Sequence, residues 1–173
     1  EELRRQGARW EEAALMMPNI VVDGRWVTGQ NPFATPGAAE AVLRALGREP
    51  GPRTIYREEA SMDLVERWLA GEHDAVRAEL ANDPARYNTD LIAMLGYYQF
   101  EAATADTIRR QALSIMELAA PHMPHPRLRI GMARAHAALG APARARELAE
   151  AVLAEDPQQA EARALLSSLP AAQ

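Results

Sequence analysis

The stretch that decides the fold runs from Arg127 to Pro157 and reads R-L-R-I-G-M-A-R-A-H-A-A-L-G-A-P-A-R-A-R-E-L-A-E-A-V-L-A-E-D-P. It holds two helical patterns, over Arg127–Leu139 and Ala143–Glu155, with Gly140 between them. Glycine commonly ends helices, because it adopts the left-handed conformation without strain. Alanine recurs along both patterns, which allows two helices to approach closely. The stretch therefore predicts two helices joined by a short turn.

Together with its flanking residues, over Pro126–Gln159, this pair resembles a tetratricopeptide unit, a helix-turn-helix repeat of about 34 residues. The residues that carry the resemblance are Ala133, Leu139, Gly140, Ala145, Asp156 and Pro157. Arg129 and His136 stand where the family has large aromatic residues. A looser copy begins near Thr89, where Leu95-Gly96-Tyr97-Tyr98 is similar to the first-helix signature, and a third spans Leu69–Pro84.

Further helical patterns surround this unit. They cover Ser61–Ala70, Glu72–Asn82, Asp90–Phe100, Ala105–Ala119 and Gln159–Leu169. One helical pair cannot bury its apolar face alone, so neighbouring pairs must stack. We therefore expect a mainly α fold, with tetratricopeptide-like helical hairpins over residues 56–173.

The resemblance implies that the first helices of the pairs line a concave groove for a protein or peptide partner, or drive self-assembly into a homo-oligomer. Carried over by position, the groove residues are Asp90, Tyr97, Phe100, Arg127 and Arg134. The alternative is that both aromatic residues are ordinary core and that the charges form a solvated face. A small-molecule sensor built on Tyr97, Phe100 and Arg134 is a third hypothesis.

The first part of the chain has a different pattern. Asn19–Val22 and Arg25–Thr28 are rich in β-forming residues, and Asp23-Gly24 between them predicts a hairpin with these two residues in its turn. Thr35-Pro36 then predicts an N-cap and a helix that Gly47 ends. Prolines and glycine in residues 49–55 predict a linker.

Val21-Val22-Asp23-Gly24, followed by Val27-Thr28-Gly29-Gln30-Asn31-Pro32, resembles the end of a class I glutamine-amidotransferase-like domain of the PfpI/ThiJ branch. The resemblance covers residues 1–48 and implies the tail of an α/β, flavodoxin-like domain. Phe33-Ala34 departs from the family's usual pair of small residues.

The same resemblance implies a parent enzyme, such as a cysteine peptidase or a glyoxalase-like or amidotransferase-like protein. Its nucleophile would lie upstream of Glu1, and this chain would contribute no catalytic residue. The loop that would border the active site consists of Thr28, Gly29, Gln30, Asn31 and Pro32. Glu1 in place of a methionine favours a missing N-terminal portion. The competing hypothesis is a complete, non-enzymatic helical scaffold with a decorative hairpin.

Composition narrows the function classes further. The 173 residues carry a net charge of −5 and no cysteine, which argues against a nucleic-acid binder and against thiolate chemistry. No apolar run is long enough for a membrane span, and a cytoplasmic protein is the simpler expectation. All 19 basic residues are arginine, which is typical of a GC-rich bacterial genome.

His122 and His125 form the most suggestive chemical cluster. With Met116 or Met123 they could bind a soft metal such as copper. Two prolines lie within the stretch from His122 to Pro126, so the two histidines do not share a helical face, and a proline-stiffened turn is the ordinary interpretation. We therefore expect no metal and no cofactor.

Overall fold

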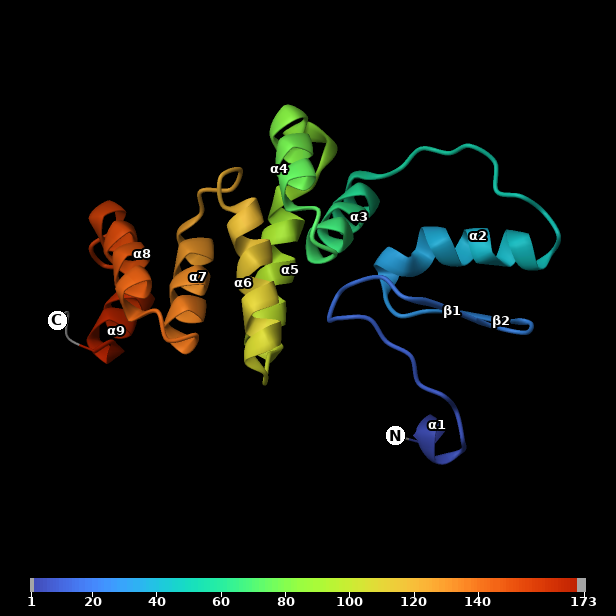
Figure 1. Cartoon of the computed structure of the whole chain (residues 1–173), viewed down its shortest axis with the longest axis horizontal. Helices are drawn as coiled ribbons and strands as arrows, with labels where there is room; N and C mark the ends of the chain where they lie inside the picture. The colour runs from blue at the N-terminus through green and yellow to red at the C-terminus, as the bar shows by residue number, and fades with distance from the viewer. Residues whose placement is uncertain (1, 171–173) are drawn as a thin grey trace.

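The computed structural model describes residues 2–170, and its body is a row of helix pairs (Figure 1). The helices of this body are α3 (Arg57–Leu69), α4 (His73–Asn82), α5 (Thr89–Ala102), α6 (Asp106–Ala119), α7 (Pro126–Ala138), α8 (Pro142–Glu155) and α9 (Ala160–Ser168). The predicted helical patterns are confirmed; the largest shift is at α3, which begins at Arg57 rather than Ser61. Within the described residues, no helix has the length and apolar character needed to cross a bilayer. Residue 1 and residues 171–173, at the ends of the predicted domains, lie outside the described part.

Glycines end the first helices of two pairs, as the sequence predicts. Gly140 follows α7 with φ +79°, and the N–H of Ala141 donates to the carbonyl oxygen of His136 at 2.8 Å. The same pattern follows α3, where Gly71 has φ +100° and Glu72 N–H donates to Arg67 O. These bonds satisfy carbonyl groups that a helix end would otherwise leave unpaired, so the chain reverses sharply there.

Small residues set the distance between neighbouring helices. Gly96 of α5 faces the backbone of α6 so closely that a Cβ there would lie 2.8 Å from the carbonyl oxygen of Ala112. Ala133 in α7 and Ala145 in α8 are fully buried, as expected for the crossing positions of a repeat unit. A second small core lies between α7, α8 and α9 around Ile130 and Val152.

An isolated hairpin precedes the helices, with strands β1 (Ile20–Asp23) and β2 (Trp26–Gly29). Asp23 pairs with Trp26, so the turn residues are Gly24 and Arg25, and the predicted turn of Asp23 and Gly24 is wrong by one residue. Gly24 has φ +56°, whereas Arg25 is not among the residues with positive φ. This matches a type II′ turn, which needs glycine only at its first central position.

The helix that follows the hairpin, α2 (Thr35–Ala45), starts differently from the prediction. Asn31 caps a short 3-10 helix, η1 (Pro32–Ala34), by accepting a hydrogen bond from the N–H of Phe33, and η1 runs directly into α2. Thr35 therefore lies inside α2 and makes no cap. None of the residues of α2 is fully buried, although the helix packs against the hairpin.

The segment before the hairpin packs onto the helical body, while the hairpin itself extends away from it (Figure 1). Met17 is buried in the main core, and Phe33 packs against that core. The buried side chain of Gln99 in α5 donates a hydrogen bond of 2.8 Å to the carbonyl oxygen of Leu15. The predicted linker at residues 49–55 is therefore not the sole connection between the N-terminal segment with its hairpin and the helical body.

An arginine in that linker adds a second connection. Arg53 donates to Glu40 of α2 at 2.8 Å and to Glu59 of α3 at 2.7 Å. The hydrogen bonds from Arg53 lower the pKa of both carboxyl groups below the ordinary value, and Arg44 adds a second such bond to Glu40. Both carboxylates are thus held ionised while they bridge α2 to α3.

Candidate functional site

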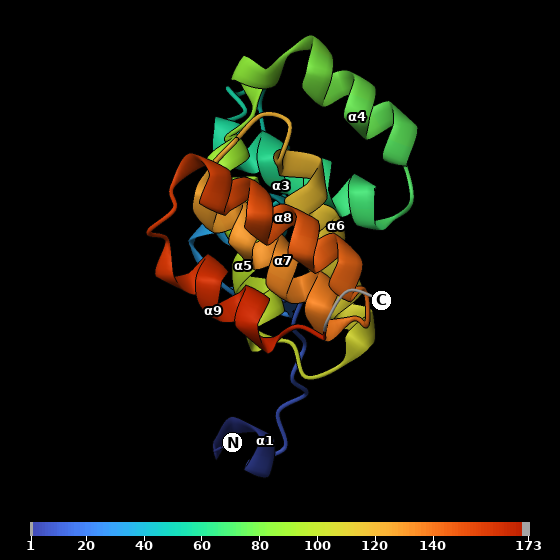
Figure 2. The same cartoon turned by 90° about the vertical axis from the view of Figure 1, so that its left-hand side faces the viewer.

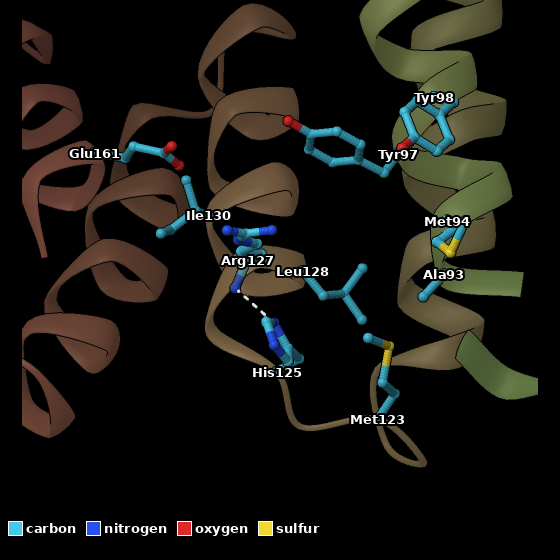
Figure 3. A pocket seen from close by; sticks show the side chains of 10 residues that line it. All are labelled: Ala93, Met94, Tyr97, Tyr98, Met123, His125, Arg127, Leu128, Ile130 and Glu161. Atoms are coloured by element: carbon cyan, nitrogen blue, oxygen red, sulfur yellow. Dashed lines mark hydrogen bonds between the residues drawn. The ribbon is translucent and has the colours of Figure 1, made fainter. Parts of the chain in front are cut away.

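A hollow of about 450 Å³ lies between α5, α7 and the start of α9 (Figure 3). Its lining residues are Ala93, Met94, Tyr97, Tyr98, Met123, His125, Arg127, Leu128, Ile130 and Glu161. The hollow is formed by the first helices of successive pairs, with α6 and α8 on the other side of the row (Figure 2). The described helices thus offer a concave surface at this place.

Helical periodicity brings the α5 residues together. Ala93 and Tyr97 are four residues apart, as are Met94 and Tyr98, so all four point from one side of the helix. The rings of Tyr97 and Tyr98 meet edge to face, with centroids 5.7 Å apart. They give the hollow a rigid apolar wall with two hydroxyl groups.

The turn before α7 builds the opposite wall. His125 caps α7, because its Nδ1 accepts a hydrogen bond of 3.1 Å from the N–H of Arg127. This bond fixes the entry of the chain into the helix, so Met123 and Leu128 line the hollow across from α5. The residues 121–126 are therefore a proline-stiffened turn with a capping histidine.

One nitrogen of the histidine pair considered for a metal has another role. Nδ1 of His125 is already engaged by the backbone of α7. Among residues 2–170 there is no group of three or more histidine, aspartate or glutamate side chains that could hold a metal ion.

The predicted groove residues separate into three places. Tyr97 and Arg127 line the hollow together. Phe100 is only 9 % exposed, and the guanidinium of Arg134 lies 5.9 Å from its ring while it pairs with Glu101 at 2.7 Å. Asp90 is exposed in the first turn of α5 and does not line the hollow. Phe100 therefore fits the aromatic-core alternative, whereas Tyr97 both packs against the main core and lines the hollow.

Sequence reasoning missed several lining residues. Met94 and Tyr98 could have been predicted from helical periodicity, because they lie near Tyr97 on the same side of α5. Glu161 could not, since its position depends on how α9 folds back beside α7.

Comparison with known proteins supports the architecture. The model of the tetratricopeptide repeat family matches residues 109–169, which include α7, α8 and α9. A tetratricopeptide-like repeat lies at residues 109–169. The unit predicted over residues 126–159 falls inside this match. Neither the curated proteins nor the solved structures gave a match.

The loop Thr28–Pro32 has a clear local role. The side-chain amide of Gln30 exchanges two hydrogen bonds with the backbone of Ala13, at 2.8 and 3.2 Å. The Nδ2 group of Asn31 donates to the carbonyl oxygen of Met17 at 2.7 Å. These two side chains hold the segment that packs onto the helical body. The role of this loop as an active-site border stays a prediction.

Proposed function

We propose that this chain is a protein-interaction module and that the hollow between α5, α7 and α9 binds a peptide segment of a partner. The observation that carries the proposal is the hollow itself, which is lined mainly by apolar side chains of consecutive first helices. Met94 is 45 % exposed and Tyr98 is similarly open, although both are large apolar side chains. Such side chains are stabilised when a partner covers them.

Selection of peptides from a random library displayed on phage, with the 173-residue chain immobilised, tests this proposal. Enriched peptides are then measured against two variants. Met94→Glu places a charge in the hollow, and Ile108→Glu places one at a similarly exposed site on α6, 40 % open, outside the hollow. We expect the first change to abolish binding and the second to leave it unchanged. Absence of enriched peptides, or equal binding by both variants, contradicts the proposal.

We also propose that residues 1–48 are the end of a PfpI/ThiJ-like α/β domain. The hairpin supports this, because Trp26 is 73 % exposed and neither strand has a third strand beside it within the described residues. A two-stranded sheet is marginal alone in water, so such open edges and faces favour a further packing partner. The competing proposal is a complete helical scaffold with a decorative hairpin.

The gene upstream of Glu1 separates these two proposals. A reading frame that encodes a cysteine on a strand-to-helix turn, roughly a hundred residues earlier, supports the α/β domain. A start codon directly before Glu1 supports the scaffold. In either case we expect the 173-residue chain alone to show no peptidase, glyoxalase or amidase turnover. Turnover that a point change within this chain abolishes would contradict that expectation.

A further inference from the structure

One arginine at the hollow differs from its neighbours in α7. Arg129 pairs with Glu155, and Arg134 pairs with Glu101 at 2.7 Å. Arg127 is exposed at the hollow, and no carboxylate of the described residues lies within 4.0 Å of its guanidinium. Its charge is therefore available to a ligand.

The lining side chains are ordered along the groove. Figure 3 shows Arg127 between the apolar side chains of α5 and Glu161 of α9. A peptide that crosses the helices in this direction meets first an apolar site at Met94, Tyr97 and Met123. It then meets the positive charge of Arg127 and, beyond it, the negative charge of Glu161.

We propose that the groove recognises a peptide in which an apolar side chain is followed by a carboxylate that binds Arg127. This inference rests on the proposed function, and it adds the chemistry of the partner. A guanidinium presents paired donors that match the two oxygens of a carboxylate, so Arg127 favours an aspartate or glutamate over a neutral residue. Charge complementarity of this kind determines which partner binds more than how tightly it binds.

Glu161 limits the number of acidic residues. A second carboxylate placed beyond the first would face Glu161, and like charges repel. The groove therefore selects a single acidic residue, followed by a neutral or basic one, rather than an acidic run.

The consensus of the phage-selected peptides tests the inference, because each variant predicts its own consensus. With the unaltered chain we expect an apolar residue followed by one aspartate or glutamate. With Arg127→Glu we expect a basic residue at the acidic position. With Glu161→Arg we expect an additional acidic residue. Arg110→Glu on α6 is the matched control and should leave the consensus unchanged, since Arg110 does not line the hollow.

Binding of a fluorescein-labelled consensus peptide, followed by anisotropy, gives the size of the effect. Arg127→Gln should weaken binding roughly fivefold, as expected for a partly solvated ion pair, and the loss should shrink at high salt. Suppose that Met94→Glu abolishes binding, but the selected peptides show no acidic preference and bind Arg127→Gln as tightly as the unaltered chain. This inference then fails and the proposed function stands. If binding survives Met94→Glu, the proposed function fails as well.

Discussion

Substitution of Gly96 by alanine tests the packing that gives the repeat its shape. A Cβ at Gly96 would lie 2.8 Å from the carbonyl oxygen of Ala112 and 2.9 Å from the backbone nitrogen of Met116. Because both atoms belong to the backbone of α6, the whole helix must retreat. Overpacking of this kind costs about 1–3 kcal/mol, and rigid neighbours favour the upper end. Alanine has a higher helix propensity than glycine, which offsets about 1 kcal/mol of this cost, so we expect the free energy of unfolding to fall by about 2 kcal/mol.

Urea unfolding followed by circular dichroism measures this loss, and the melting temperature should fall by about 4–8 °C. Gly131→Ala is the matched control, since it is also a glycine inside a helix. A Cβ there would lie 2.8 Å from the ring of Tyr97, which is a half-buried side chain, so one ring rather than a helix backbone has to shift. The free energy of unfolding should then change by less than about 0.5 kcal/mol, because the propensity gain offsets the contact. The reasoning is refuted if Gly96→Ala is as stable as the unaltered chain, or if Gly131→Ala is the more damaging change.

Arg53→Gln should lower the melting temperature at pH 7 but not near pH 3. The pKa values of Glu40 and Glu59 are lowered in the folded chain, so the stabilisation from their bonds to Arg53 is present above about pH 4.5 and is lost at lower pH. An equal difference in melting temperature at both pH values contradicts this. Burial, together with the hydrogen bond to Glu79, raises the pKa of Tyr87 to about 12. Tyr87→Phe should therefore cost about 1 kcal/mol at pH 8, and the difference should shrink between pH 10 and 12 as the phenol ionises; urea unfolding at both ends checks it. Gln99→Leu removes the donor to Leu15, so amide hydrogen exchange at Met16 and Met17 should speed up roughly tenfold while α8 is unaffected; unchanged exchange would show that this contact does not hold the segment.

The sequence predicted the helices well because their signals are local. Apolar periodicity, Gly71 and Gly140 specify where each helix turns back, and the structure confirms these ends. The hairpin was also predicted, but its turn was placed one residue early. Asp-Gly favours a turn in which both of these residues have positive φ. Here only Gly24 has a positive φ, and Asp23 belongs to the first strand, where it pairs with Trp26.

The candidate site was predicted only in part, because it depends on how successive pairs stack. Tyr97 and Arg127 could be placed by their position in the repeat. The pairing of Arg134 with Glu101 could not, since it joins two helices whose rotation depends on the packed core. The packing of Met17 against α5 was equally inaccessible, because a loop segment carries no periodicity that indicates its partner.

The central claim is that the face formed by α5, α7 and α9 binds the partner. Hydrogen exchange followed by mass spectrometry, with and without the tightest phage-selected peptide, tests it most directly. We expect added protection in fragments covering residues 93–98 and 123–130, and no change in fragments from α6 and α8 on the other side of the row. Protection confined to the hairpin or to α6 and α8 would contradict the claim.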